Sequence, residues 1–296
     1  MGASMQIVYM NGGLGNQMFQ YVFMRWLEET TGEECIIDDA PFFLPHTPHN
    51  GYELERVFGL RPKRLSEYFS ADVWQEMLAR RPEGVWGVAQ VLSDGGLSLM
   101  AVQERNTSNL SFRGQIIPYT PGTEFPRLRG HIYCHGYWLT NLFYLAIREK
   151  IEREFVFPPF TSEANLGYER LIKKSHCPVS IHIRRGDMAR HGWCAPPSFF
   201  RQAILKAETE WHPDRYFLFT DDFEWCHILA DALGLAQIRN KLTPVRGNIG
   251  AGAYRDMQLM AMCRNHISDR SSFSLMAGLL SPFEDGEDIN RWGMTN

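Results

Sequence analysis

The stretch Val179-Ser-Ile-His-Ile-Arg-Arg-Gly-Asp187 joins a short apolar run to two adjacent arginines, a glycine and an aspartate. The β-branched residues at alternate positions suit a buried strand, and Gly186 allows the backbone to turn. Ligands of open α/β sheets bind beyond the carboxyl ends of such strands, which is where Arg184 and Arg185 fall. The stretch therefore predicts a buried parallel strand that ends in an anion-binding loop.

Arg184 and Arg185 indicate what kind of anion this loop could bind. Two adjacent guanidinium groups repel each other unless a negative group lies against them, and a diphosphate offers the paired oxygens that arginine recognises in a bidentate manner. The alternative is an ordinary ion pair between one of these arginines and Asp187 in a structural turn. This stretch alone leaves both interpretations open.

The composition restricts the class of protein. With 296 residues, of which 44% are hydrophobic, the chain can bury one large or two ordinary cores. The net charge is -4, from 30 basic and 34 acidic residues, so no general positive field attracts nucleic acid. The six cysteines are scattered, without the spacing of a zinc site, and we expect reduced, mostly buried thiols.

The N-terminal segment lacks the basic, apolar and cleavage regions of a signal peptide. The sequence also contains no run of about 18 apolar residues that could cross a membrane. We therefore expect a cytoplasmic protein without a transmembrane segment.

The beginning of the chain predicts a βαβ unit, with strands at 6–10 and 34–38 and a helix at 18–31. The glycine-rich loop between the first strand and the helix resembles a dinucleotide-binding fingerprint, but Met18 stands where the third glycine belongs. NAD or FAD binding is therefore disfavoured. A tight turn that only packs strand on helix is the structural alternative.

The segment 40–130 contains early prolines and few periodic patterns. We expect much of it to be an irregular insertion, with a helix near 72–80. Residues 131–138 alternate as in a strand, and a helix is predicted at 141–155. The side chains of His135, Tyr137 and Trp138 could face a sugar, although a core strand with aromatic residues at its rim is an equally good interpretation.

The segment 156–160 contains two prolines and predicts a hinge. We therefore expect a first domain at 1–157, a second at 158–283, and a polar tail at 284–296 that is frayed. In the second domain, strands predicted at 179–184 and 215–220 alternate with helices. The helices are predicted at 163–174, 198–209, 222–233 and 254–264, with a further one ending at 280. This alternation predicts a doubly wound parallel sheet.

Two further loops follow predicted strands of the second domain and should lie beside the arginines. Ser271 and Ser272, at a predicted helix start, can offer hydroxyl and backbone N–H groups to an oxyanion, or Ser271 can be a plain N-cap. Asp221 and Asp222 could bind a divalent cation, hydrogen-bond a sugar hydroxyl or cap the next helix. Since arginines already neutralise a diphosphate, we expect no metal.

Four motifs, in this order along the chain, resemble those of the bacterial α-1,2-fucosyltransferases of glycosyltransferase family 11. They are Gly-Gly-Leu-Gly-Asn-Gln-Met-Phe-Gln at 12–20, His182-x-Arg184-Arg185-x-Asp187, Phe217-Leu-Phe-Thr-Asp-Asp222-x-Glu-Trp225 and Ser271-Ser-Phe-Ser274. The resemblance implies an α/β GT-B fold, with two Rossmann-like doubly wound domains that face a cleft. It also implies inverting transfer of L-fucose from GDP-β-L-fucose to the 2-hydroxyl of a terminal galactose in an oligosaccharide acceptor.

The resemblance further implies a role for each domain. The first domain would lie on the acceptor side, and the second would bind GDP-fucose, a substrate and not a cofactor. Arg184 would contact the donor diphosphate. The candidate donor-binding residues are His182, Arg184, Arg185, Asp221, Asp222, Ser271, Ser272 and Phe273, and the candidate acceptor-side residues are Gly13, Gly15, Asn16 and Gln17.

The sequence departs from the family pattern at several positions. Arg270 replaces the asparagine that usually precedes the serine motif, and Leu275 and Met276 replace two tryptophans. Met188 stands where the family often has tyrosine. Arg270 is therefore a possible additional cation, and a role for aromatic side chains after the serine motif is in doubt.

An inverting transfer also needs a base near the acceptor hydroxyl. The candidates are Asp187, if it is free of arginine pairing, and otherwise His191. Asn16 and Gln17 could position the acceptor but not deprotonate it. We expect His182 to support Arg184 and not to touch the substrate.

Three other functions compete with this interpretation. A different GDP-fucose-dependent GT-B transferase would form an α-1,6 or protein O-linkage. An NAD-dependent oxidoreductase would bind nicotinamide, which the incomplete glycine pattern disfavours. A non-catalytic sugar-binding module would explain the aromatic residues but not the paired arginines.

Overall fold

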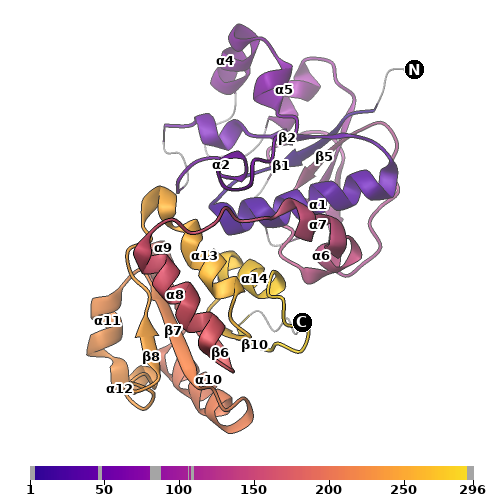
Figure 1. Ribbon diagram of the computed structural model, residues 1–296. Coiled ribbons are helices and arrows are strands. Elements are labelled where there is room, and N and C mark those ends of the chain that lie inside the picture. Colours follow the sequence, from indigo (N-terminus) through magenta and orange to yellow (C-terminus); the bar gives the residue numbers. More distant parts are fainter. Residues whose placement is uncertain (1–3, 46–48, 81–87, 106, 108–109, 292–296) are drawn as a thin grey trace. The chain divides into compact units, whose positions relative to one another are not determined.

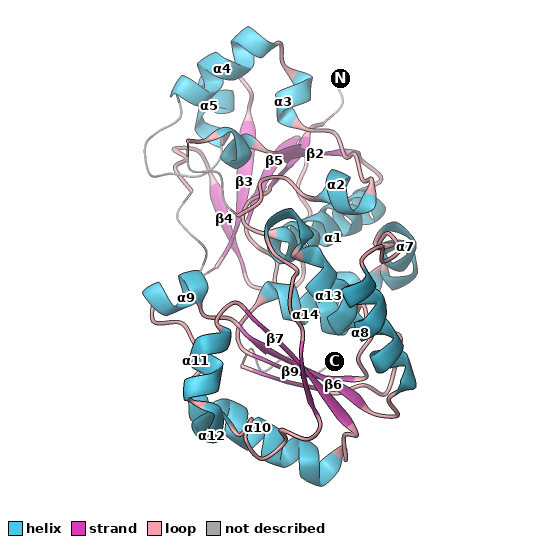
Figure 2. Cartoon of the chain, turned by 60° about the vertical axis from the view of Figure 1, so that its left-hand side comes forward, coloured by secondary structure: helices cyan, strands magenta, loops and turns pink. Residues whose placement is uncertain are grey.

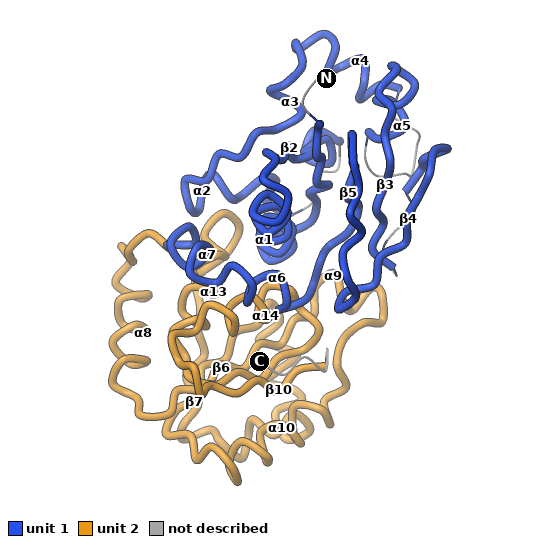
Figure 3. Tube along the Cα trace, turned by 90° about the vertical axis from the view of Figure 1, so that its right-hand side faces the viewer, with its two compact units in different colours: residues 1–156 blue, residues 157–296 orange. Residues whose placement is uncertain are grey.

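The computed structural model describes residues 4–45, 49–80, 88–105, 107 and 110–291, apart from the side chain of Asp187. The chain divides into two compact units, Met1–Val156 and Phe157–Asn296 (Figure 3). In its described residues, each unit contains a parallel β-sheet with helices on both faces (Figure 1). The doubly wound α/β architecture predicted for both domains is thus confirmed.

The sheet of unit 1 has the strand order β2-β1-β5-β3-β4, and all its pairings are parallel. Strand β1 lies inside the sheet and is buried along its whole length, which explains why apolar residues follow Gln6 in it. The strands are β1 (Gln6–Tyr9), β2 (Cys35–Asp38), β3 (Leu99–Glu104), β4 (Ile116–Tyr119) and β5 (His131–His135).

Helices cover both faces of this sheet. On one face, buried side chains of α4 and α5 pack against β1, β3 and β5, while α1 packs with α6 on the other (Figure 1). Helix α1 ends at Gly32, whose φ of 71° is the left-handed conformation of a helix C-cap. The helices are α1 (Leu14–Thr31), η1 (Ala40–Phe43), α2 (Leu54–Phe58), α3 (Leu65–Tyr68), α4 (Ala71–Arg80), α5 (Ala89–Asp94), α6 (Asn141–Ala146) and α7 (Arg148–Glu154).

Two expectations for unit 1 need revision. Part of the segment 40–130 is irregular, as expected, but the segment also supplies strands β3 and β4 of the sheet and the helices from η1 to α5. Strand β4 was hard to recognise since it lies at the edge of the sheet and contains Pro118, which edge strands tolerate. The single helix expected at 141–155 is interrupted at Ile147, whose φ of -131° is not helical.

The sheet of unit 2 has the strand order β10-β9-β6-β7-β8, again with parallel pairings. Strand β6 is the central strand, and each of its residues is buried, as the opening stretch of the sequence predicts. The strands are β6 (Pro178–Ile183), β7 (Arg215–Thr220), β8 (Leu242–Pro244), β9 (Asn265–Ser268) and β10 (Asp288–Asn290).

Helices α10 and α12 cover one face of the sheet of unit 2, and α8, α13 and α14 cover the other (Figure 2). The core on the first face joins apolar residues of α10 and α12 to alternate residues of β6. The helices are α8 (Glu163–Lys174), α9 (Gly186–Arg190), α10 (Pro197–Glu210), α11 (Phe223–Ile228), α12 (Ala230–Leu233), η2 (Gly250–Gly252), α13 (Tyr254–Ala261) and α14 (Ser272–Leu279).

The expectation of a frayed tail at 284–296 is also wrong for residues 284–291, the part of this segment that the structure describes. Asp288–Asn290 forms β10, which pairs in parallel with β9, and the His266 amide donates to the carbonyl of Glu287. An edge strand is only partly buried, so it can be polar. In addition, Leu229 divides the helix expected at 222–233 into α11 and α12.

Two further expectations concern the membrane and the thiols. Among the helices of the described ranges, none has both the length and the apolar character needed to cross a membrane. All six cysteines are free thiols, and four of them are buried, as predicted.

Candidate active site

The carboxyl ends of β9, β6 and β7 lie next to each other at one edge of the sheet of unit 2. Arg184 follows β6, Asp221 follows β7 and Asp269 follows β9. Contacts join the three loops: the Arg185 amide donates to Asp221 Oδ1 at 2.8 Å, and the Ala195 amide donates to the Asp269 carboxylate. The structure thus brings together the loops that the sequence predicts at the ligand-binding edge.

His182 is a buried residue at the end of β6, with 9% of its surface exposed. Its ring centroid lies 5.9 Å from that of Phe273, in the first turn of α14. Its Nδ1 is buried without a hydrogen-bond partner among the described residues. Burial, together with the charge of Arg184, lowers the pKa of His182 to about 3. The imidazole is therefore neutral near pH 7 and adds no positive charge beside Arg184.

Arg185 is held by its own unit. Its guanidinium lies over the Trp225 ring, 4.0 Å from the centroid, and its Nε lies 3.8 Å from Asp222 Oδ2. A cation over an aromatic face is attracted by the ring quadrupole. Arg185 thus makes a structural ion pair with Asp222. The side chain of Asp187, the partner considered from the sequence, lies outside the described residues.

Arg184 is half-buried and directly follows β6. The Cys194 thiol donates to the carbonyl oxygens of Arg184 at 3.6 Å and Arg185 at 3.9 Å. These contacts, with the bond from Ala195 to Asp269, tie both ends of the segment 184–195 to the sheet edge. The loop that carries the arginines is therefore anchored on both sides.

The two aspartates after β7 shape this loop. Asp222 Oδ1 accepts from the Trp225 amide at 2.9 Å and so caps α11, which is the capping role considered for it. A Cβ atom at Gly186 would lie 2.7 Å from Asp221 Oδ2, so a larger residue there would displace the Asp221 carboxylate. No group of three or more His, Cys, Asp or Glu side chains that could hold a metal occurs in the described part of the chain, and metal independence stays a prediction.

Helix α14 begins beside His182. Ser271 occupies its N-cap position but makes no side-chain cap hydrogen bond, so the plain N-cap role is not what the structure shows. The amides of the first turn, which begins with half-buried Ser272 and Phe273, therefore lack the usual side-chain acceptor. Because the start of a helix carries partial positive charge, this end of α14 can bind an anion.

Asp269 is an important residue that the sequence interpretation missed. It is 1% exposed, accepts from the Ala195 amide and pairs with Arg291 at 3.4 Å. Its position directly after a buried strand could have identified it, because that position lies at the ligand-binding edge of the sheet. Arg270, considered as an additional cation, is exposed and donates from Nε to the carbonyl of Arg291.

The two candidate bases lie near the arginine loop in sequence. Asp187 belongs to α9, and its side chain lies outside the description. His191 is exposed at the end of α9 and stacks on Trp193, with ring centroids 4.6 Å apart. Trp193 is 59% exposed and was not among the predicted site residues. The choice between Asp187 and His191 stays open.

The candidate acceptor-side residues lie at the start of α1 in unit 1. Gly13 is the N-cap of α1, Gly15 is buried, and Asn16 is half-buried. Gln17 is completely buried: its Nε2 donates to the carbonyls of Gly12 at 2.9 Å and Gly51 at 2.8 Å. Its Oε1 accepts from the Glu53 amide at 2.8 Å. Gln17 therefore stabilises the fold and does not face an acceptor.

The aromatic residues after β5 are divided between core and surface. Trp138 is fully buried and stacks on Phe23, with centroids 3.7 Å apart and ring planes within 6°. His135 is also buried. For these two residues the core interpretation is correct, whereas Tyr137 is half-buried.

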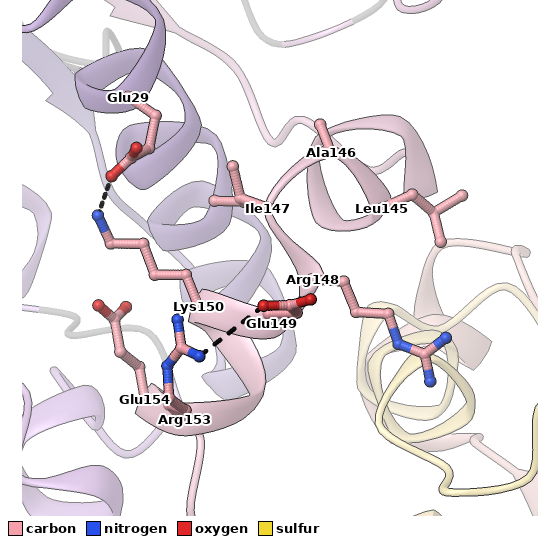
Figure 4. Close-up of a pocket in the computed structure, with 9 residues that line it drawn as sticks. All are labelled: Glu29, Leu145, Ala146, Ile147, Arg148, Glu149, Lys150, Arg153 and Glu154. Atoms are coloured by element: carbon pink, nitrogen blue, oxygen red, sulfur yellow. Dashed lines mark hydrogen bonds and ion pairs between the residues drawn. The ribbon is translucent and has the colours of Figure 1, made fainter.

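A surface hollow of about 850 Å³ lies among α1, α6 and α7 of unit 1 (Figure 4). Lys150 pairs with Glu29, and Arg153 lies 3.9 Å from Glu149. The hollow lies outside the strand ends described above, and its other two charged residues, Arg148 and Glu154, pair with Glu152 and Arg25. We assign no ligand to it.

Two Rossmann-like units, one of which has arginines and an uncapped helix start at the carboxyl ends of its strands, are the architecture of the GT-B class of glycosyltransferases. The model of the family Glycosyl transferase family 11 matches residues 121–287, and the chain belongs to this family. Membership of glycosyltransferase family 11, the GT-B fold class and the general class of glycosyltransferase are thus confirmed, and the α-1,2-fucosyl specificity stays a prediction.

Two similar curated proteins come from Escherichia coli. One is an alpha-1,2-colitosyltransferase, 23% identical over 97% of this chain and 91% of that protein. The other is the O-antigen biosynthesis glycosyltransferase WbnK, 22% identical over 93% of this chain and 90% of that protein. Both similarities extend over nearly the whole chain.

Solved structures of fucosyltransferases have a similar fold. The fucosyltransferase NodZ from Bradyrhizobium matches with a TM-score of 0.52 and 18% identity, covering 100% of this chain and 98% of that one. NodZ alpha-1,6-fucosyltransferase co-crystallised with GDP matches with a TM-score of 0.52 and 16% identity, with the same coverage. At this identity the likeness shows the fold alone.

Proposed function

We propose that the protein is an inverting α-1,2-fucosyltransferase that moves L-fucose from GDP-β-L-fucose to the 2-hydroxyl of a terminal galactose. The observation that carries the proposal is the uncapped start of α14 beside the end of the strand that leads into Arg184. Backbone N–H groups and a guanidinium are suitable donors for a diphosphate. We assign this edge of unit 2 to the GDP part of the donor.

The chemical step needs stabilisation of a leaving group. When the bond between the anomeric carbon and the GDP oxygen breaks, negative charge develops on the β-phosphate and the sugar ring becomes cationic. Arg184 and the first-turn amides of α14 would stabilise that negative charge, and such preorganised donors are usually the largest contribution to catalysis. Arg185, held by Trp225 and Asp222, would keep the loop in place.

The acceptor hydroxyl attacks the face of the sugar opposite to GDP, which converts the β donor into an α product. A base that removes the hydroxyl proton would assist this attack. Asp187 and His191, both in the segment that follows Arg184, are our two candidates. We propose no metal and no cofactor, because the leaving group is already matched by cationic and N–H donors.

A second donor is favoured by one specific observation, the similarity to an alpha-1,2-colitosyltransferase along almost the full chain. Colitose lacks the 3-hydroxyl of fucose and is otherwise the same sugar. The diphosphate contacts proposed above would therefore serve a GDP-linked colitose equally well. Only contacts to the 3-hydroxyl can distinguish the two donors.

The test is transfer from GDP-fucose and from GDP-colitose to lactose, lacto-N-biose and N-acetyllactosamine, followed by linkage analysis of the products. We expect an α-1,2-linked fucose on galactose. Transfer of colitose alone would contradict the proposed donor and keep the enzyme class. An α-1,6 linkage, or fucose transfer only to a protein, would establish one of the competing transferases.

A further inference from the structure

Unit 1 also has an edge at which neighbouring parallel strands end together. Its neighbouring parallel strands β1, β5 and β3 end side by side. Asn11 lies just beyond β1, Tyr137 just beyond β5, and Glu104 is the last residue of β3. Such an edge is where doubly wound sheets bind ligands.

Gln20 joins the loops that follow β1 and β5. Its side chain is completely buried in α1. Its Oε1 accepts from the backbone N–H of Asn11 at 3.0 Å, and its Nε2 donates to the backbone carbonyl of Gly136 at 3.0 Å. The positions of Asn11 and the 136–138 turn are therefore fixed relative to each other.

Glu104 fixes the same turn from the other side. It is 7% exposed, and its Oε2 accepts from the amides of Tyr137 at 2.7 Å and Trp138 at 2.8 Å. Burial raises the pKa of Glu104, and these two hydrogen bonds partly offset the rise. A Cβ atom at Gly136 would lie 2.6 Å from that of Glu104, so the carboxylate and the turn are in close contact.

The turn itself contains a strained residue. Trp138 has a φ of 57°, in the left-handed region that non-glycine residues seldom adopt. A buried carboxylate and a strained backbone are both unfavourable, and together they often mark a functional position. Here they determine the position of Tyr137, whose side chain is half-buried.

Asn11 provides an independent sign of a missing ligand. It is 6% exposed, and its Oδ1 is buried without a hydrogen-bond partner within the described residues. Burial raises the pKa of Tyr137, and a hydrogen bond with the Asn11 side chain lowers it in part. Asn11 Oδ1 is thus a buried, unused acceptor oxygen beside a phenol. Leaving a buried acceptor unsatisfied costs about 1–3 kcal/mol, which a bound O–H donor would recover.

We propose that Asn11 and Tyr137 form a binding site for the hydroxyl groups of a neutral hexose, and that Glu104 is the positioning residue of this site. A sugar hydroxyl both donates and accepts, so it can donate to Asn11 Oδ1 and accept from the Tyr137 hydroxyl. The buried Glu104 carboxylate disfavours a phosphate at this edge. The proposal rests on the proposed function in one respect, that the hexose is the galactose of the acceptor.

The first experiment measures lactose binding by saturation-transfer NMR, without donor, in the wild type, Tyr137→Phe and Asn11→Ala. We expect roughly 5- to 10-fold weaker binding in Tyr137→Phe, the loss of one hydrogen bond, and a similar or larger loss in Asn11→Ala. Tyr133→Phe is the matched control, because Tyr133 is buried in β5, the strand that leads to Tyr137, and its hydroxyl bonds to Asp38. It should lower stability and leave lactose binding unchanged.

The second experiment compares Glu104→Gln with Glu104→Ala. The glutamine carbonyl can still accept both amide hydrogen bonds, so the acceptor KM should stay within about threefold of wild type, whereas Glu104→Ala should raise it more than tenfold. The KM for GDP-fucose should not change in either variant. A collapse of kcat in Glu104→Gln with an unchanged acceptor KM would overturn the positioning role.

The outcomes separate this site from the proposed function. Lactose binding that depends on Tyr137, without any fucose transfer by the wild type, would support the hexose site and contradict the transferase specificity. Fucose transfer to galactosides, with unchanged lactose binding in Tyr137→Phe and Asn11→Ala, would overturn the site and keep the transferase. No lactose binding to the wild type would also overturn the site.

Discussion

The Arg185 guanidinium carbon lies 4.0 Å from the centroid of the Trp225 ring. Trp225 belongs to α11, which follows the neighbouring strand β7, so the contact joins two loops of the ligand-binding edge. Asp222 adds a carboxylate oxygen 3.8 Å from Arg185 Nε. Two arginines that are adjacent in the sequence therefore have different tasks in our account, with Arg185 shaping the loop and Arg184 serving the donor diphosphate.

Replacing Trp225 with leucine should loosen the arginine loop. We expect the free energy of unfolding to fall by about 1 kcal/mol, the size of a partly desolvated cation–π contact, and the Kd of GDP to rise about fivefold. Urea unfolding and titration calorimetry would measure these changes. Trp211→Leu is the matched control, since Trp211 packs against the core of the same unit; it should alter stability only. Equal GDP affinities in the two variants would contradict the role of Trp225.

Gly186→Ala should disturb the turn after the arginines. The added methyl group would lie 2.7 Å from Asp221 Oδ2, and overpacking of this kind costs about 1–3 kcal/mol. We expect lower stability and weaker GDP binding. Gly167→Ala, within α8, meets only the end of the Arg170 side chain at 3.8 Å and should raise stability by about 0.5–1 kcal/mol. If both variants change the free energy of unfolding in the same direction, the proposed clash with Asp221 is contradicted.

Asp256 should make stability depend on pH. Burial raises its pKa to about 7, while a hydrogen bond from Asn248 acts in the opposite direction. Because the folded state then holds a proton that the unfolded state has lost, this group decreases stability as pH rises from about 4 to 7. The stability of Asp256→Asn relative to wild type should therefore rise over this range and stay constant above it. Urea midpoints that differ by the same amount at pH 4 and pH 8 would contradict this prediction.

Removal of divalent cations should not affect the reaction. In our account the guanidinium of Arg184 and the first amides of α14 neutralise the leaving diphosphate, so no Lewis acid is required. We expect the same rate of fucose transfer in excess EDTA and in buffer with added magnesium. A rate that falls in EDTA and returns with magnesium would show that a metal takes part.

Strands β6 and β1 could be predicted from the sequence because both are buried along their whole length and rich in β-branched residues. Edge strands β4 and β10 were missed because partial burial permits proline and polar residues there. Strand β3 was also missed, although it lies inside the sheet and is largely buried. For the fold, periodicity was thus a reliable guide only where both faces of a strand are covered.

The residues of the candidate site could also be predicted only in part. Arg184, Arg185 and the serine motif were found because their types and order are distinctive. Asp269 and Glu104 were missed because the sequence does not show whether a carboxylate accepts hydrogen bonds from buried amides or is exposed to water. Gln17 was misinterpreted for the same reason: only the three-dimensional structure shows that the backbone groups of Gly12, Gly51 and Glu53 use both ends of its amide.

The measurement that tests the central claim most directly is kcat for fucose transfer from GDP-fucose to a galactoside by Arg184→Ala. Circular dichroism and gel filtration would first verify that the variant is folded, and Arg170→Ala, which removes an exposed arginine of α8, provides the matched control. We predict a kcat about 10²–10³ times lower, the usual effect of removing one donor from a developing negative charge, and an unchanged value in the control. A folded Arg184→Ala protein with near wild-type kcat would contradict the account.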